Sequence, residues 1–420
     1  MSESANDVVP LRAPHPLVWL ILYVPFGAFS GFVTVALTFL ATQHGLSIGE
    51  GALLAGSSML LQWLKWLWAP AVDITLSPKR WYLLSTGLSA LAVFTMSVVP
   101  LDKHWLWLLL LVIAAGSFIN SIVGMASEAM IAQLTPPEDV GRVSSWFQAG
   151  NLGGNGLGGG LGLLLFKVLP APWMSGAVVG AIFLACCAAL LPLPEVSAHS
   201  GERGSPGAAA REVAGNLWRM LKTRVGFLSA FLCILPIGTG AAQGTLAQAA
   251  VAAQWGAGSN EVALVQGLLA GLVTAVGSFS GGWLLARMNP RATYATFGIL
   301  LAGVATALAF APRTVTVYVI GNMVYAFGVG LAYAAFTAVA LTAVGKSAAA
   351  TGYNVFASLS NFPIWWLGLL LGWVAGHHGA TQMLLTEAAL GVAGVLVFAS
   401  VTRASGASLF AKPSTEPAVL

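Results

Sequence analysis

Charged residues are confined almost entirely to short gaps between twelve long apolar stretches, although Asp, Glu, Lys and Arg make up only 8% of the 420 residues. A hydrocarbon core ~30 Å thick requires ~20 apolar residues per helix, and its backbone groups must be satisfied within the segment. The sequence therefore predicts an all-α membrane protein with twelve transmembrane helices. The predicted spans are residues 17–42, 50–72, 81–100, 105–133, 143–169, 173–194, 226–252, 260–285, 292–311, 314–343, 349–375 and 380–402.

Basic residues in the gaps predict how the chain is oriented. An even number of spans places both termini on one side, where fourteen Lys and Arg residues lie, against Lys103, Lys167 and Arg313 on the other. The positive-inside rule then predicts that both termini lie in the cytoplasm. We expect the chain to be a monomer in a bacterial-type inner membrane. A net charge of +4 scattered over loops gives no basic patch, so we expect no nucleic-acid partner.

The longest polar interval, residues 195–224, divides the chain into six spans plus six. It opens with a Ser/Gly/Pro-rich run and closes with a basic amphipathic pattern, which predicts a cytoplasmic linker leading into an interfacial helix. The predicted organisation is an N-terminal tail (1–16), a six-helix bundle (17–194), the linker (195–224), a second six-helix bundle (225–402) and a C-terminal tail (403–420).

The two halves repeat each other at an offset of 211 residues. The matching pairs are Glu50 with Glu261, Gly56 with Gly267, and Arg80 with Arg291. The second and eighth spans also share an acidic residue in the first turn, a long apolar run and a short basic loop. Duplicated bundles are typical of alternating-access transporters, which hold their substrate near the midplane between two halves.

The loops after these two spans have a shared pattern. The first reads Ala69-Pro70-Ala71-Val72-Asp73 and then Lys79-Arg80, and the second runs from Gly282 to Arg291. Both resemble the loop signature of the major facilitator superfamily, although Ala69, Ile74 and Ala286 depart from it. The resemblance implies two pseudo-symmetric six-helix bundles and a charged cytoplasmic gate, unless these charges only set topology. The gate candidates are Asp73, Arg80, Arg142, Arg287 and Arg291.

A nine-residue segment, Lys65-Trp66-Leu67-Trp68-Ala69-Pro70-Ala71-Val72-Asp73, narrows the resemblance. It resembles the K-x-L-W-A-P-x-x-D segment of the muropeptide permease and acetyl-CoA transporter group, which short siderophore permeases share. Muropeptide permeases usually carry spans beyond twelve, and none is seen here. The resemblance implies a muropeptide-like or siderophore-like cargo.

Lys65 and Glu128 are predicted to lie inside the membrane near the cytoplasmic end. Lys65 precedes Asp73 by eight residues, which places it ~12 Å into the helix, and Glu128 has nearly the same depth. An ion pair between Lys65 and Glu128 would compensate both charges. A proton on Glu128 would weaken this ion pair and thereby bias the gate. A static pair or a polar cavity lining is the alternative. Glu387, in the last span, is expected to pack or to face the interface instead.

Polar residues inside apolar spans indicate a water-filled cavity, because an unpaired amide facing lipid is costly. In the resembled superfamily the first, fourth, seventh and tenth spans line the cavity. Each residue could instead form an interhelical hydrogen bond. The candidates are Tyr23, Thr34, Asn120, Gln148, Asn151, Asn155, Gln243, Asn322, Tyr325, Asn354, Ser358 and Asn361.

Two smaller patterns concern helix starts and helix packing. Ser47 and Glu50 form an S-x-x-E capping pattern, and Glu261 follows Ser259 in a similar way. Gly150, Gly154, Gly158 and Gly162 form a stripe that lets helix backbones approach closely.

The patterns together predict a secondary transporter rather than an enzyme. The sequence has no Walker A run, zinc spacing or Ser/His/Asp grouping, so no cofactor or metal is expected. The predicted function is a permease that moves a moderately polar organic solute by alternating access, coupled to protons. The alternatives are a drug or metabolite exporter on the same fold and a non-transporting membrane receptor.

Overall fold

The computed structural model describes residues 14–69, 72, 75–135, 140–195, 215, 218–285, 289–344 and 349–406. Within these ranges the regular structure is helical and contains no strand. The gate candidates Asp73 and Arg287 lie outside the described residues, as does most of the predicted linker, and only the backbone of Arg142 is described.

Where the structure describes them, the six spans predicted for the first half are mostly helical. Short π and 3₁₀ segments interrupt or end several of them. The elements are α1 (Leu17–Gly31), η1 (Phe32–Leu37), α2 (Thr38–Gln43), α3 (Ile48–Leu64), η2 (Lys65–Leu67), α5 (Pro78–Val98), α6 (Leu106–Leu134), α7 (Val140–Gly156), η4 (Leu157–Leu161), α8 (Gly162–Val168), α9 (Pro172–Cys186) and η5 (Cys187–Leu190).

The second half follows the same plan with one break. The predicted continuous helix over 226–252 is wrong, because glycines with positive φ interrupt it: Gly238 at +60° and Gly240 at +65°. The elements are α11 (Arg224–Ile234), α12 (Ala242–Leu246), α13 (Ala249–Ala252), η6 (Ala253–Trp255), α14 (Ser259–Val262), η7 (Ala263–Leu269), α15 (Ala270–Leu285), α16 (Pro290–Phe310), α17 (Val315–Val344) and α18 (Ala349–Ala404).

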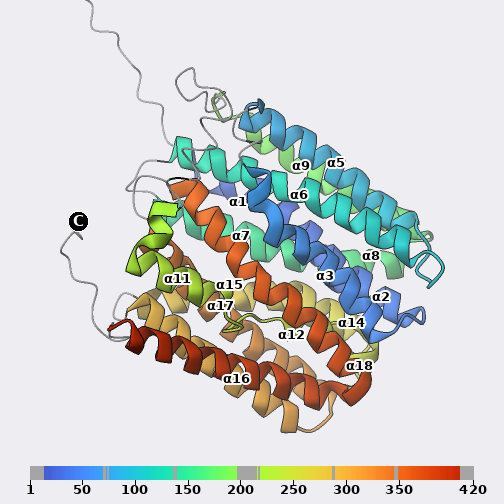
Figure 1. The fold of residues 1–420 in the computed structure, drawn as a ribbon. Helices are drawn as coiled ribbons and strands as arrows, with labels where there is room; N and C mark the ends of the chain where they lie inside the picture. The colour runs from blue at the N-terminus through green and yellow to red at the C-terminus, as the bar shows by residue number, and fades with distance from the viewer. Residues whose placement is uncertain are drawn as a thin grey trace, which may run out of the picture.

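Helix α18 contains the last two predicted spans. Gly379 has φ +86° and separates them, and Figure 1 shows the orange first part and the red second part running in different directions. Eight helical stretches of the described chain are long and apolar enough to cross a membrane, and one of them includes both parts of α18. The full count of twelve crossings stays a prediction.

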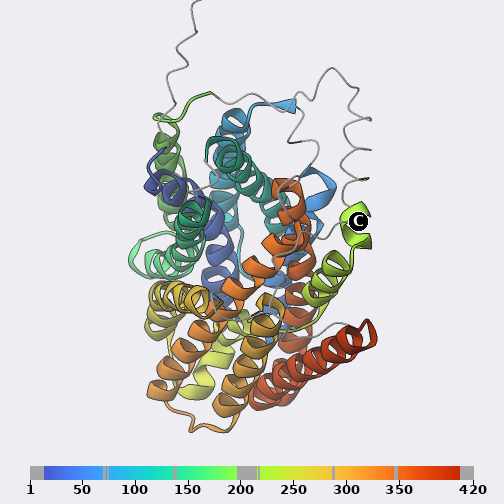
Figure 2. The same ribbon diagram turned by 90° about the vertical axis from the view of Figure 1, so that its left-hand side faces the viewer.

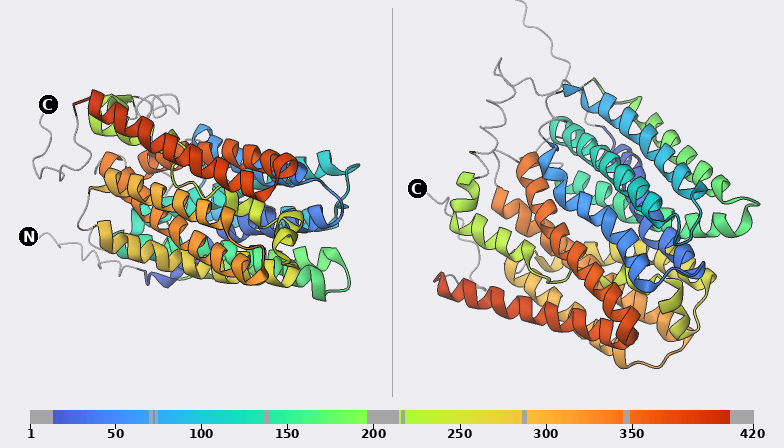
Figure 3. Two further views of the ribbon diagram at one scale, coloured as in Figure 1. Left: turned by 90° about the horizontal axis from the view of Figure 1, so that it is seen from below. Right: turned by 45° about the vertical axis from the view of Figure 1, so that its right-hand side comes forward.

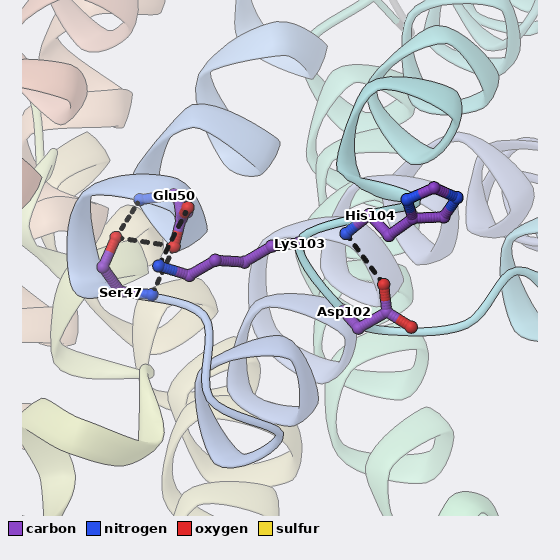
Figure 4. Close-up of polar contacts among 5 residues, drawn as sticks. All are labelled: Ser47, Glu50, Asp102, Lys103 and His104. Atoms are coloured by element: carbon purple, nitrogen blue, oxygen red, sulfur yellow. Dashed lines mark hydrogen bonds and ion pairs between the residues drawn. The ribbon is translucent and has the colours of Figure 1, made fainter.

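The capping pattern at the start of α3 is confirmed. The Ser47 hydroxyl accepts from the Glu50 backbone N–H at 3.2 Å, and the Glu50 carboxylate accepts from the Ser47 N–H at 2.6 Å. Lys103, in the loop before α6, lies 3.7 Å from the other Glu50 oxygen (Figure 4). Glu261 has the same role at the start of α14, where it accepts from the Gly258 N–H at 2.8 Å. These bonds satisfy N–H groups that a helix start leaves free.

The glycine stripe brings α7 and η4 into backbone contact with α1. A Cβ atom at Gly150 would lie 2.3 Å from the Leu20 carbonyl oxygen, and one at Gly158 would lie 1.8 Å from that of Ala28. No larger residue fits such an approach. In the second half α15 and α17 meet in the same way, since a Cβ atom at Gly330 would lie 2.1 Å from the carbonyl oxygen of Thr274.

Two buried tyrosines show that the halves are built alike. Tyr82 on α5 donates to the Leu22 carbonyl of the first span, and Tyr294 on α16 donates to the Ile237 carbonyl of the seventh, both at 2.8 Å. Both helices have 21 residues with Pro in the first turn, and each tyrosine is the fifth residue. The two bonds are therefore alike in the two halves, although the tyrosines lie 212 residues apart, one more than the predicted offset.

The two halves lie against each other along α3 and α18 and along α7 and α15. Figure 1 shows the blue-to-green helices together in its upper part and the yellow-to-red helices below, and the views in Figures 2 and 3 agree. Several contacts between the halves lie at the end predicted to face the outside. A Cβ atom at Gly372 would lie 2.1 Å from that of Ala52, and the Thr42 hydroxyl accepts from the Ala249 N–H at 3.0 Å. The halves are thus joined at that end.

Candidate substrate cavity between the halves

A cavity of about 270 Å³ lies between the two halves, and elements from both contribute to its wall. Seven of the twelve polar residues predicted to face a cavity line it. They are Tyr23, Thr34, Gln148, Asn151, Asn155, Gln243 and Asn361. Lys65 and Glu128 are the two charged residues of the described lining. The wall therefore offers many neutral hydrogen-bonding groups and little fixed charge.

Three glutamines line the cavity that the sequence analysis missed: Gln62, Gln248 and Gln266. Gln62 lies one turn before Lys65, so the helical spacing of these two polar residues could have placed it on the same face. The Gln62 carbonyl also accepts from the Asn361 side chain at 3.3 Å, which joins α3 to α18 at the wall. Gln248 follows the irregular part of the seventh span, which a continuous-helix prediction hides.

The other five predicted cavity residues lie outside the lining, buried between helices. The Asn120 side chain donates to the Phe26 carbonyl at 3.1 Å, and that of Asn322 accepts from Gln266 and donates to the Tyr318 carbonyl at 2.7 Å. An interhelical hydrogen bond satisfies a polar side chain as well as cavity water does. The remaining three are Tyr325, Asn354 and Ser358, which are 1%, 8% and 1% exposed.

The contact expected between Lys65 and Glu128 is absent from this structure. Both line one cavity, but the ion pair present among the described residues joins Lys103 to Glu50 instead. The positions of two residues along their helices determine how deep they lie in the membrane. They do not determine whether the two side chains point toward each other. The α-helix also ends at Leu64, and Lys65 begins the 3₁₀ turn η2.

Glu128 is held by Tyr23 rather than by a cation. The Tyr23 hydroxyl donates to Oε1 of Glu128 at 2.8 Å, whereas the buried Oε2 has no hydrogen-bond partner among the described residues. Lys65 is only 5% exposed, and none of the ion pairs and hydrogen bonds of the described residues involves its ammonium. An acid and a base therefore face the same cavity without neutralising each other directly.

An aromatic cluster stands beside the polar wall. Trp365 of α18 lines the cavity and stacks on Trp63 of α3, with ring centroids 5.6 Å apart and an interplanar angle of 13°. Phe362 packs against Trp63 at 4.7 Å. Such packing fixes the orientation of the Trp365 ring and gives the cavity a rigid apolar face.

Two of the gate candidates are described with their side chains. Arg80 and Arg291 occupy the first turns of α5 and α16, where their backbone N–H groups bond the caps Ser77 and Asn289 at 3.4 and 3.0 Å. Arg80 is the third residue of α5 and Arg291 the second residue of α16, so their positions are similar in the two halves. Their part in a gate stays a prediction.

A family comparison agrees with this architecture. The sequence model of the Major Facilitator Superfamily matches residues 19–364, which is most of the chain. The chain belongs to the major facilitator superfamily. As a member, it is a multi-pass inner-membrane secondary transporter for a small molecule, and the cavity lies where that superfamily holds its substrate, between the two bundles.

Within the superfamily, the chain resembles curated anhydromuropeptide permeases. It is 24% identical to that of Escherichia coli (strain K12) over 348 residues, covering 79% of this chain and 69% of the permease. The protein of Escherichia coli O157:H7 matches equally. The resemblance read from the segment Lys65–Asp73 is thereby confirmed.

Solved structures of the superfamily share the fold. A D-xylose-proton symporter superposes with a TM-score of 0.67 at 14% identity, covering 91% of this chain and 96% of that chain. The nucleoside transporter NupG gives 0.64 at 15% identity over 92% and 98%. A POT family transporter in complex with 5-aminolevulinic acid gives 0.69 at 10% identity over 93% and 96%.

Proposed function

We propose that this protein is a proton-coupled symporter for a moderately polar solute of the muropeptide class, a sugar joined to a short peptide. The observation that supports it most directly is the cavity wall, which combines eight side-chain amides with one ammonium and one carboxylate. The amides are those of Gln62, Gln148, Asn151, Asn155, Gln243, Gln248, Gln266 and Asn361. Amides donate and accept equally well, so they suit a ligand rich in hydroxyl and peptide groups.

Lys65 limits the charge of the cargo. A buried ammonium is costly unless an anion or water compensates it. A carboxylate on the solute would supply that charge, as the peptide part of a muropeptide does. A single cation does not suit a highly anionic ligand such as a coenzyme A ester.

Trp365 suits the sugar part of such a solute. Its ring is held by Trp63 and faces the cavity, so one face of a pyranose ring can pack on it while the hydroxyl groups reach the amides. The name of the curated relative, anhydromuropeptide permease, agrees with this class of cargo.

Glu128 is the proposed proton site. Its ionised form has one donor, Tyr23, and an uncompensated oxygen in a poorly hydrated position. Proton binding removes that unpaired charge and changes the field that Lys65 and the bound solute experience. Proton occupancy and solute binding are linked in this way without a direct ion pair.

The orientation and the gate complete the proposal. Both termini face the cytoplasm, and the tails, bundles and linker have the boundaries predicted above. Asp73 and Arg142, with Arg80, Arg287 and Arg291, close the cytoplasmic end when the outer end opens. The basic character of these loops supports this orientation.

Transport by purified protein in proteoliposomes tests the proposal. Radiolabelled anhydromuropeptide should accumulate when the outside is made acidic, and a protonophore should abolish the accumulation. Accumulation under the opposite gradient would identify an exporter. If a siderophore moves while anhydromuropeptides do not move under either gradient, the proposed cargo is wrong and the proposed transport mechanism stands.

A further inference from the structure

The interrupted seventh span forms part of the cavity wall and needs support from its neighbours. Between α11 and α12 the chain is irregular from Leu235 to Ala241, and Thr239, Gly240, Ala241 and Gln243 line the cavity. An interrupted helix leaves backbone N–H groups without helical partners. What holds these groups also sets the position of the wall.

A buried carboxylate from the last span bonds this restart. Oε1 of Glu387 accepts from the backbone N–H of Ala242, the first residue of α12, at 3.1 Å. The Tyr325 hydroxyl of α17 lies 2.7 Å from Oε1 and 2.8 Å from Oε2. Glu387 is 6% exposed and Tyr325 is 1% exposed. The carboxylate therefore forms a hydrogen bond with the wall segment from a position outside the cavity lining.

The charge of Glu387 has no cationic partner among the described residues. From the packed helices, Tyr325 is the titratable group that faces it, while the seventh span presents the N–H of Ala242. The charged residue of α16 is Arg291, in the first turn of that helix, and α17 has no acidic or basic residue. Hydrogen bonds to an ionised acceptor are roughly twice as strong as those to a neutral one. Protonation of Glu387 would therefore weaken its hydrogen bond with the Ala242 N–H.

We propose that Glu387 is a positioning residue of the second half, whose charge state sets the position of the cavity wall from Thr239 to Gln243. This role is distinct from that of Glu128, which faces the cavity itself. Through Ala242, a proton on Glu387 and a ligand on the wall affect each other's binding, and the linkage is reciprocal. The inference depends on the fold and not on which solute is carried.

Cysteine labelling tests it without any substrate. The experiment uses a chain with Cys186, Cys187 and Cys233 replaced by Ala. In this background, Gln243→Cys measures the accessibility of the wall, and Thr34→Cys measures the accessibility of the cavity face of the first half. The rate of reaction with N-ethylmaleimide is measured for each over a range of pH, and their ratio removes the pH dependence that the two thiols share. We expect this ratio of labelling rates to change by about threefold or more between the two ends of the pH range.

Glu387→Gln should make that ratio independent of pH, because the amide keeps the shape and loses the proton site. A ratio that is already flat in the parent, or that keeps its pH dependence in Glu387→Gln, would overturn the proposal.

Two tyrosine variants give a second, independent test. Tyr325→Phe removes the donor to Glu387 and should shift the midpoint of the pH dependence. Tyr318→Phe is the matched control, since Tyr318 is also buried and donates to the same span, at the Leu246 carbonyl at 2.8 Å, without touching a carboxylate. It should keep the midpoint of the parent. Equal behaviour of the two variants would show that Glu387 has only a structural role.

Discussion

The hydroxyl of Tyr23 on α1 donates a 2.8 Å hydrogen bond to the Glu128 carboxylate on α6, across 105 residues of sequence. The bond joins the first and fourth spans at the cavity wall and leaves one carboxylate oxygen without a described partner. The carboxylate is thereby held at a fixed place on the wall. The proposed coupling depends on this arrangement.

Replacing Glu128 by Gln should separate transport from the proton gradient. The amide can still accept from Tyr23 but carries no proton to exchange, so uptake driven by a pH gradient should be lost while substrate exchange continues. Counterflow and gradient-driven uptake in the same proteoliposomes measure the two activities. Tyr23→Phe, which keeps the acid, should retain gradient-driven uptake with an altered pH profile. Equal loss of both activities in Glu128→Gln would indicate a role in binding or folding instead.

Lys65 should discriminate between charged and neutral forms of one solute. Lys65→Gln should raise the Km for an anhydromuropeptide acid about tenfold or more, equivalent to ~1.4 kcal/mol, because the carboxylate loses its ionic partner. The Km for the methyl ester of the same compound should change little, and Lys65→Arg should preserve the preference for the acid. An equal effect on acid and ester would exclude Lys65 as the anion-binding group.

Backbone contact between α1 and α7 makes the glycine stripe intolerant of a single methyl group. Gly158→Ala should destabilise the protein by about 1–3 kcal/mol, because the new Cβ must push away the Ala28 carbonyl. Gly153→Ala, five residues earlier on α7, is the control, since nothing lies within 4 Å of the Cβ position there. Thermal unfolding in detergent should show a lower midpoint for Gly158→Ala alone. Matching midpoints would mean that the two helices can separate freely.

The sequence was sufficient for the features that depend on local pattern. Apolar length located the helices, the Ser47 and Glu50 spacing located a cap, and the stripe through Gly158 predicted close packing. Each of these follows from the geometry of one helix. The duplication is also visible locally, because Tyr82 and Tyr294 occupy the same position in two equivalent helices.

The direction in which a buried polar side chain points could not be predicted in the same way. Asn120 and Asn322 are indistinguishable in sequence from Asn151 and Asn155, yet the first two bond neighbouring helices, at Phe26 and Gln266, and the others line the cavity. That choice depends on how helices are rotated against each other. Glu387 shows the same limit. It was expected to pack or to face the interface, and it is buried, but its bond to Ala242 exists only because the seventh span is interrupted.

The join between α3 and α18 should control opening of the cavity toward the outside. A Cβ atom at Gly372 would lie 2.1 Å from that of Ala52, so Gly372→Ala must separate the two helices where the halves now touch. Gly376→Ala, one turn away, is the matched control, because its nearest neighbours are at 3.8 and 3.9 Å. We therefore expect Gly372→Ala, and not Gly376→Ala, to favour the outward-open state.

A cysteine at Gln248 on the cavity wall can report this change, with the native cysteines again replaced by Ala. In right-side-out vesicles, a membrane-impermeant maleimide should label Gln248→Cys faster when Gly372→Ala is present, by about threefold if the shift is worth ~0.7 kcal/mol. Faster labelling in inside-out vesicles instead would reverse the predicted orientation of the chain. Unchanged labelling in both kinds of vesicle would show that the contact between α3 and α18 does not limit opening.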